Sequence, residues 1–431
     1  MSVLLGCIAD DFTGATDLAG MLVKSGMRTI QLIGIPAAVN GQVGPIPNDV
    51  DAVVIALKSR TAPVETAVGE SLAALRWLQQ AGCRQFFFKY CSTFDSTAKG
   101  NIGPVTEALM QALDTGFTIA CPAFPANGRT IYQGYLFVGD VPLHESGMRD
   151  HPLTPMTDAN LVRVLQQQVR GKVGLTPQRV VEQGSAAIGE RFAFLQEAGC
   201  NMTIVDAVSE RDLHAIGAAC AALPLVTGGS GLALGLPDNF RRAGLLAREH
   251  HANALPATGG LQAVIAGSCS VATQRQVAIM AAQAPSFRID PLRLAAGDDL
   301  VQSALAWAAE HLAAGPVLIY ATATPESVRQ AQQQLGVERA GSLVETALGQ
   351  IATGLVALGV GQLIVAGGET SGAVVKALGI TGLRIGAEID PGVPWTVALP
   401  GQEGAMPLAL ALKSGNFGSE DFLLKAWGSL S

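Results

Sequence analysis

The feature that most constrains the fold is a repeated pattern of a short apolar run, a glycine-rich or polar turn and a helical stretch. The run at 363–366 leads into Gly367 and Gly368, and a helical segment follows at 373–378. Short apolar runs bounded by glycine are typical of strands buried in a parallel sheet. Similar runs occur at 3–9, 51–57, 86–90, 117–121, 202–205, 225–226, 263–266, 317–320 and 407–412. We therefore expect an α/β fold with mainly parallel sheets flanked by helices.

The length of the chain predicts two domains. With 431 residues it exceeds the size at which a single core usually stops growing. A segment with proline, glycine and paired histidines at 249–260 has the composition of a linker, after which the strand pattern restarts. The predicted domains are therefore 1–248 and 261–431. Because open parallel sheets bind ligands beyond the carboxyl ends of their strands, we expect a polar cluster in each domain and an active site in the cleft between them.

Composition excludes several classes of partner. The net charge is −7, and no run of basic residues interleaved with aromatic residues occurs, which argues against nucleic-acid and anionic-membrane partners. No apolar run reaches membrane-spanning length, and the N-terminus lacks the basic region of a signal peptide. Seven scattered cysteines suit a reducing compartment. These features predict a cytoplasmic protein, and they leave a homo-oligomer open.

The second domain contains the residue types of a polyphosphate site. Glycine turns and helix starts offer backbone N–H groups to an anion, and serine or threonine adds hydroxyls. Neither a Walker A loop nor a complete G-x-G-x-x-G sequence occurs. Glu369 is an acid among these groups, so we expect it to act through a metal, a ribose or a water. The predicted nucleotide-binding residues are Ser268, Ser270, Gly367, Gly368, Glu369, Thr370, Lys413, Gly415 and Asn416.

The first domain has a cluster of mixed charge. Adjacent acids at a strand end are costly without a positive partner, which favours a functional role for Asp10 and Asp11. The alternative is that at least one of them only caps a helix. Carboxylates, cations and hydroxyls together suit a small, hydroxylated, anionic molecule. The predicted substrate-binding residues are Thr13, Gly14, Arg60, Lys89, Ser92, Asp95, Ser96, Asn101 and Arg129, with Asp10, Asp11 and Lys99 as catalytic candidates.

Two further features carry expectations. The segment 122–157 is rich in proline, glycine and polar residues, and it reads as a long functional loop. No pattern of histidines or cysteines indicates a zinc site, and the sequence assigns no metal ligands.

A site for a phosphate donor in one domain and a site for a polar acid in the other indicate a small-molecule kinase. Two other classes compete with this interpretation. A dehydrogenase would need a nicotinamide site, which the missing dinucleotide fingerprint disfavours. A two-lobed binding or sensor protein would also have a hinge and a cleft, but it would have no reason for three glycine- and serine-containing phosphate loops. Tight nucleotide binding without turnover would indicate this second class.

The motifs of the whole chain resemble those of the four-carbon acid sugar kinase family. The resemblance depends on the segments 8–17, 88–103, 127–129, 145–149, 226–232, 267–270, 366–372 and 413–418. It implies that the N-terminal domain binds the acid sugar and that the C-terminal domain binds ATP. Our hypothesis for the transfer adds Mg²⁺ as the ion that bridges the β- and γ-phosphates. The family's nucleotide contacts would fall on Ser268, Gly415 and 367–370.

The resemblance also implies a reaction, the phosphorylation of the 4-hydroxyl of a four-carbon acid sugar. We expect the acceptor to be 3-oxo-tetronate, with D-threonate or D-erythronate as the alternative. Our hypothesis is that Asp10 or Asp11 orients or deprotonates the attacking hydroxyl. Lys99 and Arg129 would hold the substrate carboxylate or the transferring phosphate.

Overall fold

The chain folds into two compact units, Met1–Asn253 and Ala254–Ser431. The structure is a computed structural model that describes residues 3–36, 46–151, 153–247, 251–399 and 407–430. The division between the units falls inside the linker predicted at 249–260, of which residues 249 and 250 lie outside the described residues. The bounds of that linker stay a prediction, and each unit is described by itself.

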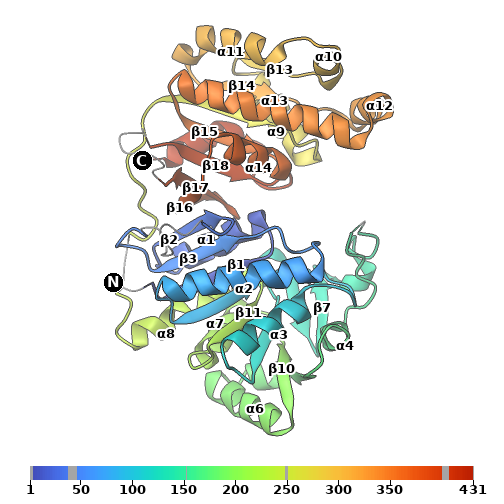
Figure 1. Ribbon diagram of the computed structural model, residues 1–431, viewed down its shortest axis with the longest axis vertical. Helices are drawn as coiled ribbons and strands as arrows, with labels where there is room; N and C mark the ends of the chain where they lie inside the picture. Colours follow the sequence, from blue (N-terminus) through green and yellow to red (C-terminus); the bar gives the residue numbers. More distant parts are fainter. Residues whose placement is uncertain (1–2, 37–45, 152, 248–250, 400–406, 431) are drawn as a thin grey trace. The chain divides into compact units, whose positions relative to one another are not determined.

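The first unit is built on parallel strands in the order β2-β3-β1-β4-β11-β5-β10-β9 (Figure 1). The central strands are apolar on both faces, as expected for strands covered by helices on each side. In chain order they span Leu5–Ala9 (β1), Thr29–Ile33 (β2), Ala52–Ala56 (β3), Gln85–Lys89 (β4), Thr118–Cys121 (β5), Lys172–Thr176 (β9), Cys200–Val205 (β10) and Leu225–Gly228 (β11).

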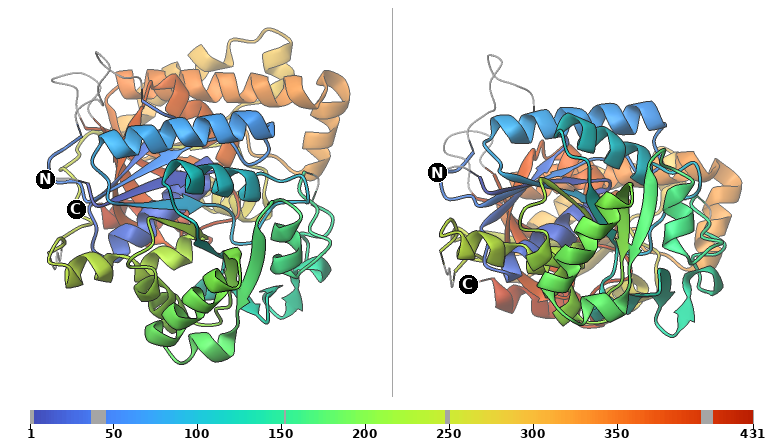
Figure 2. Two further views of the ribbon diagram at one scale, coloured as in Figure 1. Left: turned by 60° about the horizontal axis from the view of Figure 1, so that its bottom comes forward. Right: turned by 90° about the horizontal axis from the view of Figure 1, so that it is seen from below.

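Helices cover both faces of these strands. They are Phe12–Lys24 (α1), Val64–Gln80 (α2), Ile102–Ala112 (α3), Leu161–Gln166 (α4), Gln178–Val181 (α5), Ser185–Glu197 (α6), Glu210–Ala219 (α7) and Pro237–Arg242 (α8). Helix α1 leads from β1 past β3 to β2, whereas α2 leads from β3 past β1 to β4. Because such crossovers are right-handed, α1 and α2 lie on opposite faces. Figure 2 shows α2 and α3 together on one side of the strands and α6 on the other.

This order places a topological switch point at the carboxyl end of β1. Strands β3 and β4, the neighbours of β1, both lead into helices on the face opposite to α1. Ligands of open α/β sheets bind at such a point.

The segment at 122–157 contains a small antiparallel sheet, so the prediction that it is a loop throughout was wrong, whereas its functional role stays a prediction. Its strands are Arg129–Tyr132 (β6), Tyr135–Val138 (β7) and Val141–Pro142 (β8). Gln133 and Gly134 both have positive φ, 51° and 76°, as in the tight turn of a hairpin. The buried Asp206 carboxylate accepts from both of their N–H groups. A Gln-Gly pair between four-residue strands is a weak hairpin signal, which explains why the pattern did not indicate one.

The second unit has strands in the order β13-β14-β12-β15-β18-β17-β16. They span Leu261–Ala266 (β12), Ser286–Arg288 (β13), Val317–Tyr320 (β14), Val360–Ala366 (β15), Gly382–Asp390 (β16), Val393–Ala398 (β17) and Ala409–Lys413 (β18). The first five in this order are parallel, whereas β17 pairs antiparallel with both β18 and β16. The predicted α/β fold with mainly parallel sheets is therefore confirmed.

The helices of the second unit repeat the arrangement of the first. They are Val271–Ala281 (α9), Pro291–Ala295 (α10), Leu300–His311 (α11), Pro325–Leu335 (α12), Val337–Ala357 (α13), Gly368–Ala377 (α14) and Phe422–Lys425 (α15). Helix α9 leads from β12 past β14 to β13, whereas α12 and α13 lead from β14 past β12 to β15. The crossovers therefore place α9 opposite α13 and α14, and the carboxyl end of β12 is a second switch point. Figure 1 shows α11, α12 and α13 together.

The core of the second unit lies between its strands, α9 and the C-terminal segment. Val264, Ile364 and Trp395 are buried there, and the indole Nε1 of Trp395 donates to the Ala426 carbonyl at 2.9 Å. Among the described residues of the whole chain, no helix is both long and apolar enough to cross a membrane.

Candidate functional site

Charged side chains gather at the carboxyl end of β1. Asp10 follows the last residue of this strand, and Arg60 lies in the turn after β3. The Arg60 guanidinium makes two parallel hydrogen bonds to Asp10, at 3.0 Å and 2.9 Å. It also donates to Asp11 at 2.6 Å, and it lies 3.6 Å from Asp95. Lys89, the last residue of β4, completes what we call the charge cluster, which consists of Asp10, Asp11, Arg60, Lys89 and Asp95.

Asp11 caps helix α1 and faces both cations of the charge cluster. Its Oδ1 accepts from the Gly14 N–H at 3.2 Å, from Arg60 and from the Lys89 ammonium at 3.4 Å. All three donors use the same oxygen, and no described residue donates to Oδ2. The side chain of Asp11 is 30% exposed, against 6% for Asp10. Asp11 therefore combines a capping role with a carboxylate oxygen to which no described residue donates.

The surroundings shift the pKa values of the two adjacent acids, Asp10 and Asp11, in opposite directions. Burial raises the pKa of the Asp10 carboxyl above its ordinary value, against the opposing effect of Arg60. Burial acts in the same direction on Asp11, but Lys89 and Arg60 outweigh it and hold the pKa of that carboxyl below its usual range. The same acids outweigh burial at the two cations and raise the pKa of Arg60 and of Lys89. Asp11 is therefore the acid that this arrangement keeps ionised most strongly.

Backbone and amide contacts fix the turn that carries Arg60. The N–H groups of Ser59 and Arg60 donate to the Asp10 carbonyl at 3.0 Å and 3.2 Å. The side-chain amide of Asn101 donates to the carbonyls of Ser59, Arg60 and Ala62 at 2.7–3.2 Å. Asn101 was predicted to bind substrate, but in this structure its amide nitrogen holds the Arg60 turn. A Cβ atom on Gly14 would lie 1.7 Å from the Lys89 Nζ, so a side chain at this position would displace the Lys89 ammonium.

The structure brings some of the other predicted substrate residues near the charge cluster but not all. Thr13 is half-buried in the first turn of α1, and Ser92 is half-buried in the segment after β4. The buried Ser96 hydroxyl accepts from the Gln168 amide at 2.8 Å. Lys99 is exposed, and Arg129 lies on β6, where it donates to the Asn127 carbonyl. Neither Lys99 nor Arg129 pairs with a carboxylate in the described part of the chain.

Loops after three neighbouring strands of the second unit meet in what we call the glycine–serine cluster, which consists of the segments 267–270, 367–370 and 413–416. Ser268 lies at its centre. A Cβ atom on Gly415 would lie 2.4 Å from the Ser268 Oγ, and one on Gly367 would lie 3.0 Å from the Ser268 nitrogen. A Cβ atom on Gly267 would lie 2.2 Å from the Thr370 Oγ1. Close approach of the three loops therefore depends on glycine at each contact.

Two helices, α9 and α14, begin at this cluster, and a described side chain caps only α9. The Ser270 hydroxyl caps α9 by accepting from the Thr273 N–H at 3.2 Å. No described side chain caps α14, which begins after Gly367 with φ at 133°. The N–H groups of Gly368, Glu369 and Thr370 therefore have no acceptor among the described residues, and Gly368 and Glu369 are exposed. An uncapped helix start of this kind presents free donors and the positive end of the helix dipole to an anion.

Lys413 does not extend from the cluster into solvent. Its side chain is buried, and its Nζ donates to Thr273 Oγ1 at 3.1 Å, to the Ser414 carbonyl at 3.0 Å and to the Gly415 carbonyl at 3.2 Å. The Gly415 carbonyl also accepts from the Ser270 hydroxyl at 2.5 Å and from the Thr273 hydroxyl at 2.8 Å. Lys413 therefore holds a loop of the cluster in place, whereas Asn416 in the same loop is exposed.

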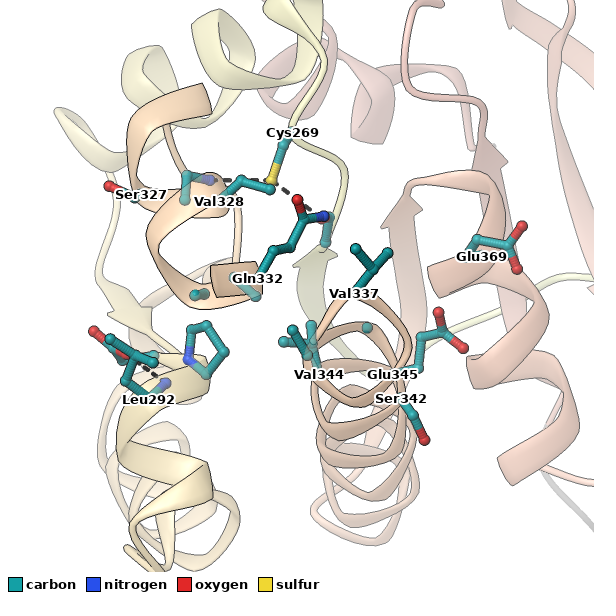
Figure 3. A pocket seen from close by; sticks show the side chains of 18 of the residues that line it. Cys269, Leu292, Ser327, Val328, Gln332, Val337, Ser342, Val344, Glu345 and Glu369 are labelled. Carbon is teal, nitrogen blue, oxygen red and sulfur yellow. Dashed lines mark hydrogen bonds between the residues drawn. The ribbon is translucent and has the colours of Figure 1, made fainter. Parts of the chain in front are cut away.

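A pocket of about 600 Å³ opens beside the glycine–serine cluster (Figure 3). Its lining includes Cys269 and Glu369 at the cluster and the apolar side chains of Leu292, Val328 and Val344, which come from α10, α12 and α13. Small-molecule sites are typically concave, largely apolar and supplied with a few polar groups. The size and lining of this pocket suit an organic group that is attached to an anion at the cluster.

Sequence patterns did not reveal every residue that builds this site. Thr273 lies three residues after the Ser270 cap and contacts both Lys413 and Gly415, so the spacing S-x-x-T was an available signal. The Thr322 hydroxyl donates to the Ser268 carbonyl at 2.9 Å from the turn after β14. The pocket walls on α10, α12 and α13 carry no motif, because helix packing brings them together.

Comparisons with known proteins agree with this division into two units. A family of sugar-binding N-terminal domains matches residues 5–236, and a family of nucleotide-binding C-terminal domains matches residues 263–423. A 3-oxo-tetronate kinase of Burkholderia multivorans is 62% identical over 427 residues, which are 99% of this chain and 97% of the relative. A 3-oxo-tetronate kinase of Pseudomonas fluorescens is 62% identical over 429 residues, with the same coverage.

Solved structures of two related proteins have the same fold. A Haemophilus influenzae protein has a TM-score of 0.86 and 45% identity, covering 99% of this chain and 100% of that protein. A Salmonella typhimurium protein has a TM-score of 0.90 and 45% identity, covering 99% of both chains. The full-length relatives and both domain matches confirm the resemblance that the motifs indicated. The chain therefore belongs to the four-carbon acid sugar kinase family, with a sugar-binding N-terminal domain and a nucleotide-binding C-terminal domain.

Proposed function

We propose that this protein is an ATP-dependent kinase that phosphorylates the 4-hydroxyl of 3-oxo-tetronate, giving 3-oxo-tetronate 4-phosphate. The observation that carries the proposal is the pair of unlike sites at equivalent positions, charged after β1 and rich in glycine and serine after β12. The identity of 62% to two 3-oxo-tetronate kinases supports the choice of acceptor.

The nucleotide is proposed to bind with its phosphates at the glycine–serine cluster. The uncapped start of α14 supplies N–H groups, and Ser268 and Thr370 supply hydroxyls beside them. The adjacent pocket has room for the nucleoside, whose base would contact Val328 and Val344. Polyphosphate recognition of this kind needs oriented donors more than a dense positive field.

The acid sugar is proposed to bind at the charge cluster through its hydroxyl end. The cluster contains three carboxylates and two cations, so it carries a formal excess of negative charge and would repel a carboxylate. Carboxylates accept hydrogen bonds well from hydroxyls. The acid group of the substrate would instead pair with Lys99 or Arg129, two cations of this unit that make no described ion pair.

Asp11 is the residue that we assign to the attacking hydroxyl. Its Oδ2 has no described donor, and its side chain is accessible. Both oxygens of Asp10 are occupied by Arg60, so Asp10 acts as a positioning residue for that cation. A loose phosphoryl-transfer transition state mainly requires in-line placement of the attacking oxygen. A carboxylate of low pKa can therefore contribute to catalysis by orienting the hydroxyl.

Mg²⁺ is proposed to accompany the nucleotide. No three side chains of histidine, cysteine, aspartate or glutamate gather as a metal site in the part of the chain that the structure describes. This fits an ion held mainly by phosphate oxygens, with Glu369 as the nearby exposed carboxylate, because Mg²⁺ usually keeps several waters and few protein ligands. The ion would neutralise charge on the β- and γ-phosphates.

The test is an ADP-coupled assay of the purified protein with ATP and a panel of four-carbon acid sugars. We expect the highest kcat/KM with 3-oxo-tetronate and low values with D-threonate and D-erythronate. A preference for either of the latter acids would contradict the proposed acceptor. Tight binding of ATP without phosphorylation of any acid would instead indicate a nucleotide-binding sensor.

The cleft predicted between the domains stays a prediction.

A further inference from the structure

Lys413 is a buried cation whose hydrogen bonds all go to neutral groups. It is the last residue of β18, its side chain is fully buried, and its three acceptors are the Thr273 hydroxyl and the carbonyls of Ser414 and Gly415. An ammonium has three donors, so all of its hydrogen-bonding capacity is used. No carboxylate of the described residues pairs with it. Its hydrogen bonds are satisfied while its charge is not balanced.

The orientation of the two carbonyls has a consequence for the loop. In a planar trans peptide the N–H group points away from the C=O group. Because the Ser414 and Gly415 carbonyls face the ammonium, the N–H groups of Gly415 and Asn416 point away from it. Neither N–H donates to any described residue. Successive free N–H groups in a turn are donors that an anion can bind.

These N–H groups belong to the same cluster as the uncapped helix start. The Gly367 N–H donates to the Lys413 carbonyl at 2.8 Å, which joins the start of α14 to the end of β18. Gly415 lies against Ser268, since a Cβ atom there would come within 2.4 Å of its hydroxyl oxygen. An anion at this cluster would therefore have a buried ammonium behind the loop that binds it.

The charged groups of the surrounding elements leave Lys413 without a counterion. Strands β12, β15 and β17 contain no titratable side chain. On α9 the exposed Arg275 pairs with Glu420, and on α14 both Glu369 and Lys376 are exposed. Cys269 is the titratable side chain of the loop after β12. Burial accordingly lowers the pKa of the Lys413 ammonium to about 8.

We propose that Lys413 is a positioning residue of the nucleotide site, that its ammonium turns two backbone N–H groups toward the phosphates, and that nucleotide binding is coupled to its protonation. The proposal rests on the proposed function, because it takes the anion at the cluster to be a nucleotide. A phosphate chain supplies the missing negative charge and so favours the charged form of the lysine.

The experiment is calorimetric titration of the full chain with ATP between pH 7 and pH 9.5, in pairs of buffers that differ in ionisation enthalpy. The terminal phosphate has a pKa of about 6, so it does not titrate in the upper part of this range. We expect the wild-type protein to take up protons on binding ATP near pH 9. We also expect the affinity for ATP to fall by up to about tenfold for each pH unit above the pKa that Lys413 has in the nucleotide-free protein.

Substitutions of Lys413 test whether ATP binding depends on the titration of its charge or only on the presence of a long side chain. Lys413→Arg keeps a charge that does not titrate, so it should abolish proton uptake and flatten the pH profile. Lys413→Met should lower ATP affinity at every pH and also remove proton uptake. Arg275→Met, which removes an exposed cation of α9, is the matched control and should keep the wild-type profile. Thermal unfolding of each variant checks that it folds.

The outcomes distinguish this proposal from the proposed function. ATP binding without proton uptake near pH 9 would overturn the coupling, and so would a wild-type pH profile in Lys413→Arg. Absence of ATP binding at every pH would overturn the nucleotide site itself, and the coupling with it. The wild-type titration needs no variant, so it decides the question even where a substitution prevents folding.

Discussion

The charge cluster and the glycine–serine cluster lie at corresponding points of their sheets, after β1 and after β12. In both units the neighbouring strands lead into helices on the opposite face, which makes these strand ends the switch points. The chemistry at the two points differs. Side-chain ion pairs fix the first cluster, whereas close backbone contacts and helix starts fix the second.

This contrast shows how two substrates can be recognised on one architecture. A small hydroxylated acid has few atoms, so its recognition needs directed charges such as Arg60 and Asp11. A polyphosphate can be bound by many equivalent backbone donors. The first unit should therefore be sensitive to loss of a charge, and the second should be sensitive to an added Cβ atom.

The largest effect on stability is expected for Asp10→Ala in the first unit. This substitution leaves the half-buried Arg60 guanidinium without its two-bond partner, and breaking a buried ion pair typically costs about 3–5 kcal/mol. Because Asp11 remains 2.6 Å from Arg60, we expect a loss near 3 kcal/mol in the free energy of unfolding. Urea unfolding measures it. A loss below about 1 kcal/mol would show that Asp10 does not organise the charge cluster.

Asp11→Asn tests the catalytic side of the same cluster. Asparagine still caps a helix, so the hydrogen bond to the Gly14 N–H can persist while the charge is lost. We expect kcat to fall by about 10²-fold or more, with KM for ATP unchanged. Wild-type kcat in the ADP-coupled assay would remove Asp11 from the reaction.

The pH dependence of stability gives an independent check on Asp11. Its folded pKa lies below the unfolded value, so its charge stabilises the fold above about pH 4, and this contribution is lost as the pH falls through the folded pKa. The difference in the free energy of unfolding between wild type and Asp11→Asn should therefore disappear in acid. A difference that persists there would have to come from something other than the charge of Asp11.

The backbone pattern could be predicted from the sequence, but the side-chain geometry could not. Apolar runs end just before Asp10, Gly267 and Gly367, and these runs predicted that both clusters lie at strand ends. The turns that follow parallel strands lie at the carboxyl edge of the sheet, where ligands bind. The pattern could not show that all donors to Asp11 share one oxygen. It also could not show that Lys413 turns inward, because a lysine after a buried strand has the same sequence context in either orientation.

Tertiary packing accounts for the elements that the sequence did not reveal. Strand β2 alternates polar and apolar residues over only five positions, so its periodicity is short. The antiparallel direction of β17 is set by its pairing with β18 and not by its own residues. Glu369 and Val344 line one pocket although different helices carry them, which only helix packing determines.

An added Cβ atom tests the second unit. A Cβ atom on Gly368 would meet no protein atom within 4 Å, so Gly368→Val should fold normally. If phosphates bind at the start of α14, the valine would occupy their place, and we expect ATP affinity to fall by about 10–100-fold. Gly372→Val is the matched control, since its Cβ atom is also free of contacts and lies further along the same helix. Equal ATP affinities of the two variants by calorimetry would place the phosphates elsewhere.

The smallest effect is expected for Ser270→Ala, which removes a side-chain contact from a cluster that the backbone mainly builds. The substitution deletes the cap of α9 and one of three hydrogen bonds to the Gly415 carbonyl. Loss of a serine cap typically costs about 1 kcal/mol. Because Thr273 and Lys413 still hold that carbonyl, KM for ATP should rise by less than about tenfold. A loss of ATP binding as large as that in Gly368→Val would mean that side chains control this site as strongly as they control the charge cluster, and the contrast between the two units would fail.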